Sequence, residues 1–136
     1  MTGAEYFVLR FEPHDDLKKR IAAFTHERNI QAGAIVSGVG SLEDVHLRFA
    51  NRPEGTKLHG PHEILSLTGT LSVNGLHLHL SVADTNGQVT GGHLLDDNLV
   101  YTTAEIVIAV FTDISFKREI DPTYGYKELQ IQKKAP

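Results

Sequence analysis

The chain has 136 residues, of which 40% are hydrophobic and 22% are charged, a composition typical of one folded domain rather than of a disordered chain. It contains no cysteine, which excludes disulfide bonds and thiolate metal ligands, so a metal would need histidine, aspartate or glutamate. The formal net charge of −4 argues against broad electrostatic binding to nucleic acid. Eight histidines are a high count for this length, and their positions become the main question.

No targeting or membrane-spanning segment is evident. Residues 1–5 lack a basic stretch followed by an apolar core, so they do not resemble a signal peptide. The longest apolar runs, such as Ile106–Phe111, are too short to cross a bilayer. We therefore expect a cytoplasmic protein with no membrane partner.

The first half of the chain combines strands with one helix. Residues 5–11 alternate and are rich in aromatic and aliphatic side chains, which predicts a strand. Leu17, Ile21 and Phe24 recur at helical spacing after two aspartates, which predicts an amphipathic helix over about 15–28. Further strands are expected at 32–37 and 42–49, separated by a turn at 38–40, and a loop is expected over 51–60.

The second half predicts a series of hairpins. From residue 63 onward the alternation is regular, and it places Leu65, Leu67 and Leu71 on one face of a strand. Asn74-Gly75 is a strong hairpin signal, after which Leu78 and its alternate neighbours would face the core. The remaining strands are expected at 88–93, at 106–111 and in a last segment near 116 or 129–131.

Together these elements predict one α+β domain over residues 1–136. Many short strands, a single main helix and no βαβ alternation are typical of a mostly antiparallel sheet with a helix packed on it. No repeat, linker or second domain is visible in the sequence.

His77 and His79 are separated by one residue on the strand that returns from the Asn74-Gly75 turn. Residues i and i+2 of a strand project from the same side and lie about 6.5–7 Å apart along it. The two imidazoles therefore project together from the polar face, opposite the leucines.

The next turn decides whether His93 joins them. A three-residue loop over 85–87, with its glycine in the left-handed conformation, places His79 directly opposite His93. A two-residue loop would instead pair His93 with Leu80 and turn it toward the core. Gly91 and Gly92 offer a further way to change the register, because glycines allow a strand to bend.

Three interpretations of these histidines are open. Three neutral imidazoles with coordination positions left over suit Zn²⁺ or, less selectively, another first-row divalent ion. Exposed strand histidines that contribute only solubility are the plain alternative, and a pH-sensitive interface is the third.

Glu105 is the one carboxylate that we consider as a catalytic candidate. It lies between two threonines and an apolar strand, where a carboxylate beside a metal could serve as a general base. The structural alternative, which we favour, is a residue that caps or pairs across a subunit contact. His59 and His62 flank Pro61, are expected to face solvent and are assigned no function.

Several segments resemble the PPC (plant and prokaryote conserved) domain family, and the similarity runs over about residues 6–129. Residues 60–69, GPHEILSLTG, are similar to the central strand of the family. The stretches at 33–42, 77–84, 91–93 and 102–108 are similar to its stand-alone prokaryotic branch.

The resemblance implies a compact antiparallel sheet with a helix on one face, assembled as a homotrimer. It also implies that His77, His79 and His93 are the metal ligands, often of zinc. Our leading interpretation is therefore a homotrimeric metal-binding protein, and a second is a metal-dependent enzyme acting on a small molecule.

A third hypothesis, a DNA-associated regulator, follows from the DNA-binding label often given to this family. Plant members pair the domain with a basic AT-hook, and the present sequence has no such segment. Pro61-His62 also replaces the Arg-Phe of the plant motif. DNA binding is therefore doubtful for this chain.

Overall fold

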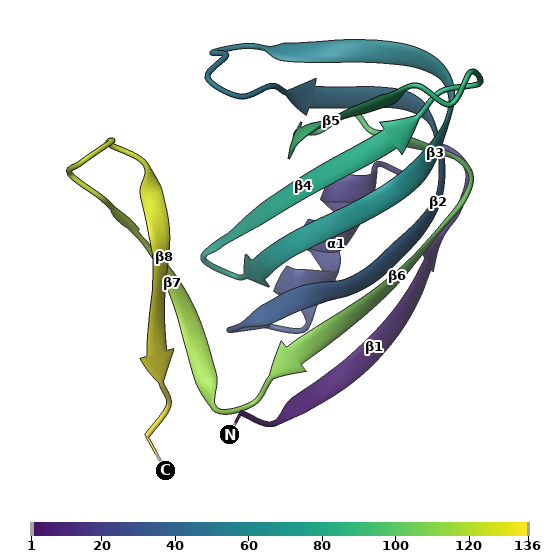
Figure 1. The fold of residues 1–136 in the computed structure, drawn as a ribbon. Helices are drawn as coiled ribbons and strands as arrows, with labels where there is room; N and C mark the ends of the chain where they lie inside the picture. The colour runs from purple at the N-terminus through teal and green to yellow at the C-terminus, as the bar shows by residue number, and fades with distance from the viewer. Residues whose placement is uncertain (1, 136) are drawn as a thin grey trace.

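The computed structural model describes residues 2–135 as eight strands and one helix (Figure 1). The elements, in chain order, are β1 Ala4–Phe11, α1 Leu17–Glu27, β2 Gly33–Arg48, β3 Gly55–Ser72, β4 Gly75–Ala83, β5 Val89–Leu94, β6 Leu99–Phe111, β7 Ile114–Ile120 and β8 Lys127–Lys133. The predicted α+β class is confirmed.

Six strands form one antiparallel sheet in the order β1-β6-β2-β3-β4-β5, and β7 and β8 form a separate two-stranded sheet. Strand β5 also pairs with the end of β2, where Leu47 lies opposite Leu94 and Arg48 opposite His93. Strands β2, β3, β4 and β5 are therefore linked in a ring. This closure brings the end of β2 next to the strands that carry the histidines.

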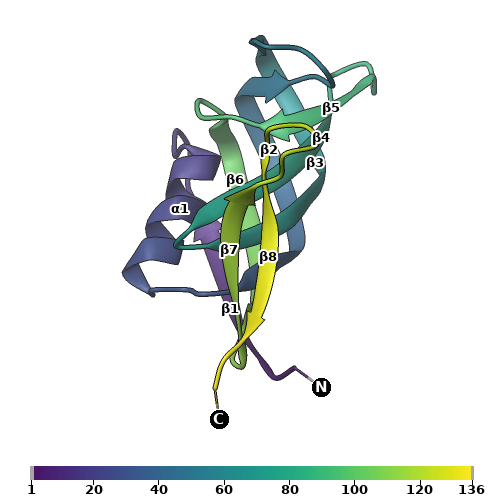
Figure 2. The ribbon, with the colours of Figure 1, turned by 90° about the vertical axis from the view of Figure 1, so that its left-hand side faces the viewer.

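Helix α1 covers one face of the sheet and leaves the other open (Figures 1 and 2). It begins after Asp16, whose carboxylate accepts a hydrogen bond from the backbone N–H of Lys19 at 3.1 Å, the usual way an N-cap stabilises a first turn. Leu17 and Ile21 are fully buried against the sheet. The helix predicted over 15–28 is thus confirmed.

The core lies between α1 and the inner face of the sheet. In β4, Leu78, Leu80 and Val82 are buried and alternate with the histidines on the outer face. Burial of each such side chain contributes about 1.5–3 kcal/mol, so the strand is held with its polar face outward.

The C-terminal hairpin stands to the side of the main sheet (Figure 1). Its two strands, β7 and β8, correspond to the two alternatives considered for the last strand, and both form. The side-chain amide of Asn74, in the β3–β4 turn, donates a 2.9 Å hydrogen bond to the carbonyl of Phe116. This contact ties the hairpin to the end of the sheet that carries His77.

The turn expected at residues 38–40 does not form, because β2 runs unbroken through them. Gly40 has φ +147°, and a Cβ there would collide with the backbone carbonyl of Thr103 on β6. The glycine therefore permits a close approach of two strands rather than a chain reversal. The loop expected over 51–60 is also shorter, since β3 begins at Gly55, opposite Arg48.

Two side chains expected on particular faces lie elsewhere. Leu65 is 53% exposed, because the register with β4 shifts between Ile64 and Ser66 and leaves Leu65 as the extra residue of a bulge. His62, expected to face solvent, is only 8% exposed, since β3 includes it as an interior strand residue paired with Leu42.

Within residues 2–135, no helix is both long enough and apolar enough to cross a bilayer.

Candidate metal centre

The turn between β4 and β5 has the three-residue form that the sequence predicted as one alternative. The backbone N–H of Asp84 donates to the carbonyl of Gln88 at 3.0 Å, and Gly87 adopts φ +78°. The Asp84 carboxylate accepts hydrogen bonds from the backbone N–H groups of Asn86 and Gln88, at 2.8 and 3.0 Å. This turn sets the register in which His79 lies directly opposite His93.

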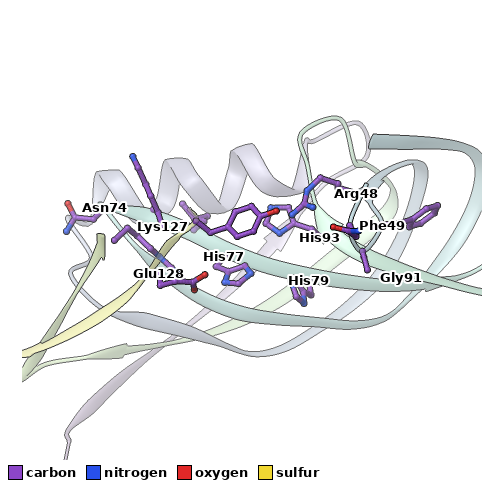
Figure 3. A pocket seen from close by; sticks show the side chains of 16 residues that line it. Arg48, Phe49, Asn74, His77, His79, Gly91, His93, Lys127 and Glu128 are labelled. Carbon is purple, nitrogen blue, oxygen red and sulfur yellow. The ribbon is translucent and has the colours of Figure 1, made fainter. Parts of the chain in front are cut away.

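The three histidines converge on the outer face of the sheet (Figure 3). One nitrogen from each of His77, His79 and His93 lies within 4.8 Å of the other two. The ring centroids of His77 and His79 are 5.0 Å apart, and that of His93 lies 5.6 and 5.8 Å from them. Glycines 91 and 92 do not move His93 out of this cluster.

Gly69 on β3 allows β4 to approach closely at the cluster. It lies opposite Leu78, at φ +144°, and a Cβ there would collide with the backbone carbonyl of His77. Its neighbours Thr68 and Thr70 pair with His79 and His77. Any larger residue at position 69 would push the strand that carries two of the three imidazoles.

The surroundings favour neutral imidazoles. Burial lowers the pKa of His93 to about 4, with a further contribution from the adjacent Arg48 guanidinium. Burial also lowers the pKa of His77, and the neighbouring His79 and Arg118 act in the same direction. Metal ligation requires the neutral ring, so at neutral pH these two imidazoles would not need to lose a proton before binding a metal.

The donor set fits a divalent transition metal. Imidazole ligands hold zinc at about 2.0–2.1 Å, which places tetrahedral ligand nitrogens about 3.4 Å apart. The nitrogens here are within 4.8 Å, so modest rotations of side chains on one open face suffice. Three histidine ligands would leave one position for another ligand.

A cavity of about 750 Å³ opens beside the cluster. The end of β2, the β3–β4 turn, β5 and the C-terminal hairpin enclose it together with the three histidines. Sequence reasoning missed the other polar and aromatic residues that line it, which are Arg48, Phe49, Asn51, Asn74, Arg118, Tyr126, Lys127 and Glu128. Strand periodicity carries no signal for them, because all of them except Asn74 belong to segments remote from the histidines in sequence.

Glu105 is not brought to this cavity. It lies on β6, opposite Arg10 of β1 on one side and Val39 of β2 on the other, and it is exposed. Five of the eight histidines lie outside the cluster, and two of these are paired with carboxylates. Nδ1 of His59 lies 2.6 Å from a carboxylate oxygen of Asp44, and Nδ1 of His14 lies 2.6 Å from one of Glu43. They are carboxylate-paired surface side chains.

Residues 1–112 match the family model of the Plants and Prokaryotes Conserved (PCC) domain, the family abbreviated PPC above. The chain belongs to this family. It is 46% identical over 135 residues to the bifunctional protein GlmU of a Synechococcus strain, an alignment that covers 98% of this chain and 22% of that protein. The chain thus spans about a fifth of the length of this relative.

Solved structures share the fold over nearly the whole chain. A protein from Salmonella enterica superposes with a TM-score of 0.97 and 36% identity, covering 99% of this chain and 98% of that one. A metal-containing protein from Archaeoglobus fulgidus superposes with a TM-score of 0.83 and 26% identity, covering 96% and 95%. The antiparallel sheet with one helix is therefore the fold of these relatives as well.

Proposed function

We propose that this chain is a homotrimeric zinc-binding protein whose ligands are His77, His79 and His93. The observation that carries the proposal is the convergence of three imidazole nitrogens within 4.8 Å on two adjacent strands. Desolvation and the neighbouring arginines favour the neutral rings of His77 and His93, and the neutral ring is the form that binds a metal.

Zinc is the metal that this donor set favours. The chain has no cysteine, and an all-imidazole site suits zinc and other first-row divalent ions better than magnesium or calcium, which prefer oxygen. The metal-containing relative from Archaeoglobus fulgidus shares the fold and supports the proposal.

The homotrimer is supported by the open face of the sheet. Tyr6 and Val8 on β1 are 67% and 76% exposed, and Val36, Val39 and Leu65 on strands β2 and β3 of the same sheet are also exposed. An apolar patch of this kind is typical of a surface that other subunits cover. Self-association would remove it from water.

A metal-dependent enzyme acting on a small molecule is the second candidate. It is favoured by the cavity of about 750 Å³ beside the cluster, a size typical of small-molecule sites. A bound zinc ion would supply Lewis-acid chemistry there. Glu128 lines the cavity and is the carboxylate placed to accept a proton from a ligand, whereas Glu105 is not.

A DNA-associated role finds less support in this chain. Its acidic residues outnumber its basic ones by 17 to 13, whereas affinity for duplex DNA depends on gathered Lys and Arg.

Metal analysis tests the proposal. Protein purified without an affinity tag is equilibrated with excess Zn²⁺ at neutral pH, freed of unbound metal and measured by elemental analysis. We expect about one zinc per chain in the wild type and none when His77→Ala and His93→Ala are combined. His59→Ala, an exposed histidine outside the cluster, should keep the wild-type content. Wild-type protein that stays metal-free would contradict the assignment.

A further inference from the structure

Two arginines bracket the histidine cluster on opposite sides. Arg48 on β2 is the strand partner of His93 on β5. Arg118 reaches the other side from β7, where its guanidinium donates a 2.9 Å hydrogen bond to the hydroxyl of Thr70, the strand partner of His77. The series Arg48, His93, His79, His77 and Arg118 therefore crosses the outer face of the sheet.

Neither guanidinium has an acidic partner among the residues that the structure describes. The ion pairs found within residues 2–135 join other residues, and the contacts of Arg48 and Arg118 are to the Arg52 carbonyl at 3.5 Å and to the Thr70 hydroxyl. Both side chains are partly buried. Partial burial of a guanidinium costs free energy when no anion accompanies the charge. The planar set of N–H donors in a guanidinium can form two parallel hydrogen bonds with one carboxylate.

The cavity is positive although the chain is acidic. Its lining contains three basic side chains, Arg48, Arg118 and Lys127, and one acidic side chain, Glu128, an excess of two positive charges with neutral histidines. The whole chain carries −4. This local reversal of sign lies at the metal site, where a bound cation would increase it further.

The rest of the lining points to an organic anion. Phe49, Ala50 and Leu76 form an apolar part of the wall, and Tyr126 adds an aromatic ring from the C-terminal hairpin. Apolar side chains of this kind make favourable contacts with the carbon atoms of a ligand, and an inorganic ion has none. The volume of about 750 Å³ leaves room for a molecule with several non-hydrogen atoms besides its charged group.

We propose that Arg48 and Arg118 bind the carboxylate of a small organic acid in this cavity, next to the metal held by the three histidines. The inference rests on the proposed function, because the metal completes the positive site. It specifies the ligand class that the site accepts: a monocarboxylate with an apolar body.

The test uses benzoate as a probe of this class, benzamide as its neutral counterpart and inorganic phosphate as an anion without an apolar body. Each is titrated into zinc-loaded and zinc-free protein and followed by NMR chemical-shift changes. We expect benzoate to bind the zinc-loaded protein at least about tenfold more tightly than benzamide or phosphate, as loss of a charged hydrogen bond implies. Binding to zinc-free protein should be weaker.

Variants locate the site. Arg48→Gln and Arg118→Gln should each weaken benzoate binding about tenfold or more while zinc content stays at the wild-type level, since loss of a nearby positive charge does not disfavour a cation. Arg118→Lys keeps the positive charge but not the planar set of N–H donors, so it should bind benzoate with intermediate affinity. This conservative variant also separates loss of the ligand contact from a folding defect. Arg20→Gln on α1 removes the same charge from a side chain that does not line the cavity, and it should bind benzoate as the wild type does.

The outcomes separate the two proposals. Full zinc content with equal affinity for benzoate and benzamide, or with unchanged benzoate binding in both Arg→Gln variants, overturns the carboxylate site and leaves the metal site standing. If phosphate binds as tightly as benzoate, the inference that the ligand has an apolar organic body is wrong. A failure of wild-type protein to take up zinc overturns the metal site and this inference with it.

Discussion

His79 and His93 face each other across the β4–β5 pair, with ring centroids 5.8 Å apart, although 13 residues separate them in the chain. The hairpin turn that ends at Gly87 sets this register. The addition or removal of one residue in that turn would move His93 to the other face of its strand. The candidate metal centre therefore depends on the length of one loop.

Zinc should stay bound at mildly acidic pH. The pKa of His93 is about 4 and that of His77 is also below its ordinary value of 6.5, mainly because desolvation disfavours the charged form of both rings. Protons compete with the metal only where the rings protonate, so we expect zinc retention at pH 6 and release as the pH falls toward about 4. Elemental analysis after dialysis at each pH checks this. Complete release at pH 6.5 would contradict it.

The metal-free protein should lose stability over the same range. As the pH falls from 6.5 toward about 4, the unfolded chain binds protons at these positions before the folded chain does. The free energy of unfolding therefore falls with the pH in this window and is unaffected by these two groups above it. Urea unfolding at several pH values measures the slope. His93→Gln, which cannot titrate, should show a shallower slope.

Gly69→Ala should weaken both the fold and the metal site. Alanine at φ +144° costs about 1–3 kcal/mol, and its Cβ also meets the carbonyl of His77. Gly60→Ala is the matched control, because Gly60 has φ +105° and a Cβ added there would meet nothing within 4 Å. We expect a larger loss of unfolding free energy and of zinc affinity for Gly69→Ala. Equal effects would show that the contact with β4 is unimportant.

The protein should sediment as a trimer. Val8, 76% exposed on β1, lies within the apolar face that we assign to the subunit contact. Val8→Glu should shift the sedimentation coefficient toward that of a 15.0 kDa monomer, because a charge buried in an apolar contact is costly. Thr85→Glu, at the tip of the β4–β5 loop, should leave the trimer intact. A wild-type monomer or dimer at micromolar concentration would refute the assignment.

Duplex DNA should not be bound appreciably near physiological salt. With a net charge of −4 per chain, association with the phosphate backbone meets overall repulsion. A gel-shift titration in about 150 mM salt is the measurement, a concentration at which charges more than about 8 Å apart are screened. Submicromolar retention of a duplex that resists competitor DNA would show the prediction to be wrong.

Much of the fold could be predicted because its signals are local. The alternation of Leu78, Leu80 and Val82 with polar residues predicts which side of β4 is buried, and the structure confirms it. The spacing of Leu17 and Ile21 likewise predicts the buried side of α1. The predictions failed where pairing with another strand changed the local pattern, as at Leu65 in its bulge and at Gly40 beside β6.

By itself the sequence determined that His77 and His79 project from one face, since strand geometry repeats every two residues. For His93 the sequence left two positions open, which correspond to a two-residue or a three-residue loop between β4 and β5. Only the tertiary structure decided that choice, and only it gathered Arg48, Arg118 and Glu128 around the cluster. The reason is physical. These residues meet through β2–β5 pairing and through the docking of the C-terminal hairpin, which depend on the packing of the whole chain and leave no periodic trace in any one segment.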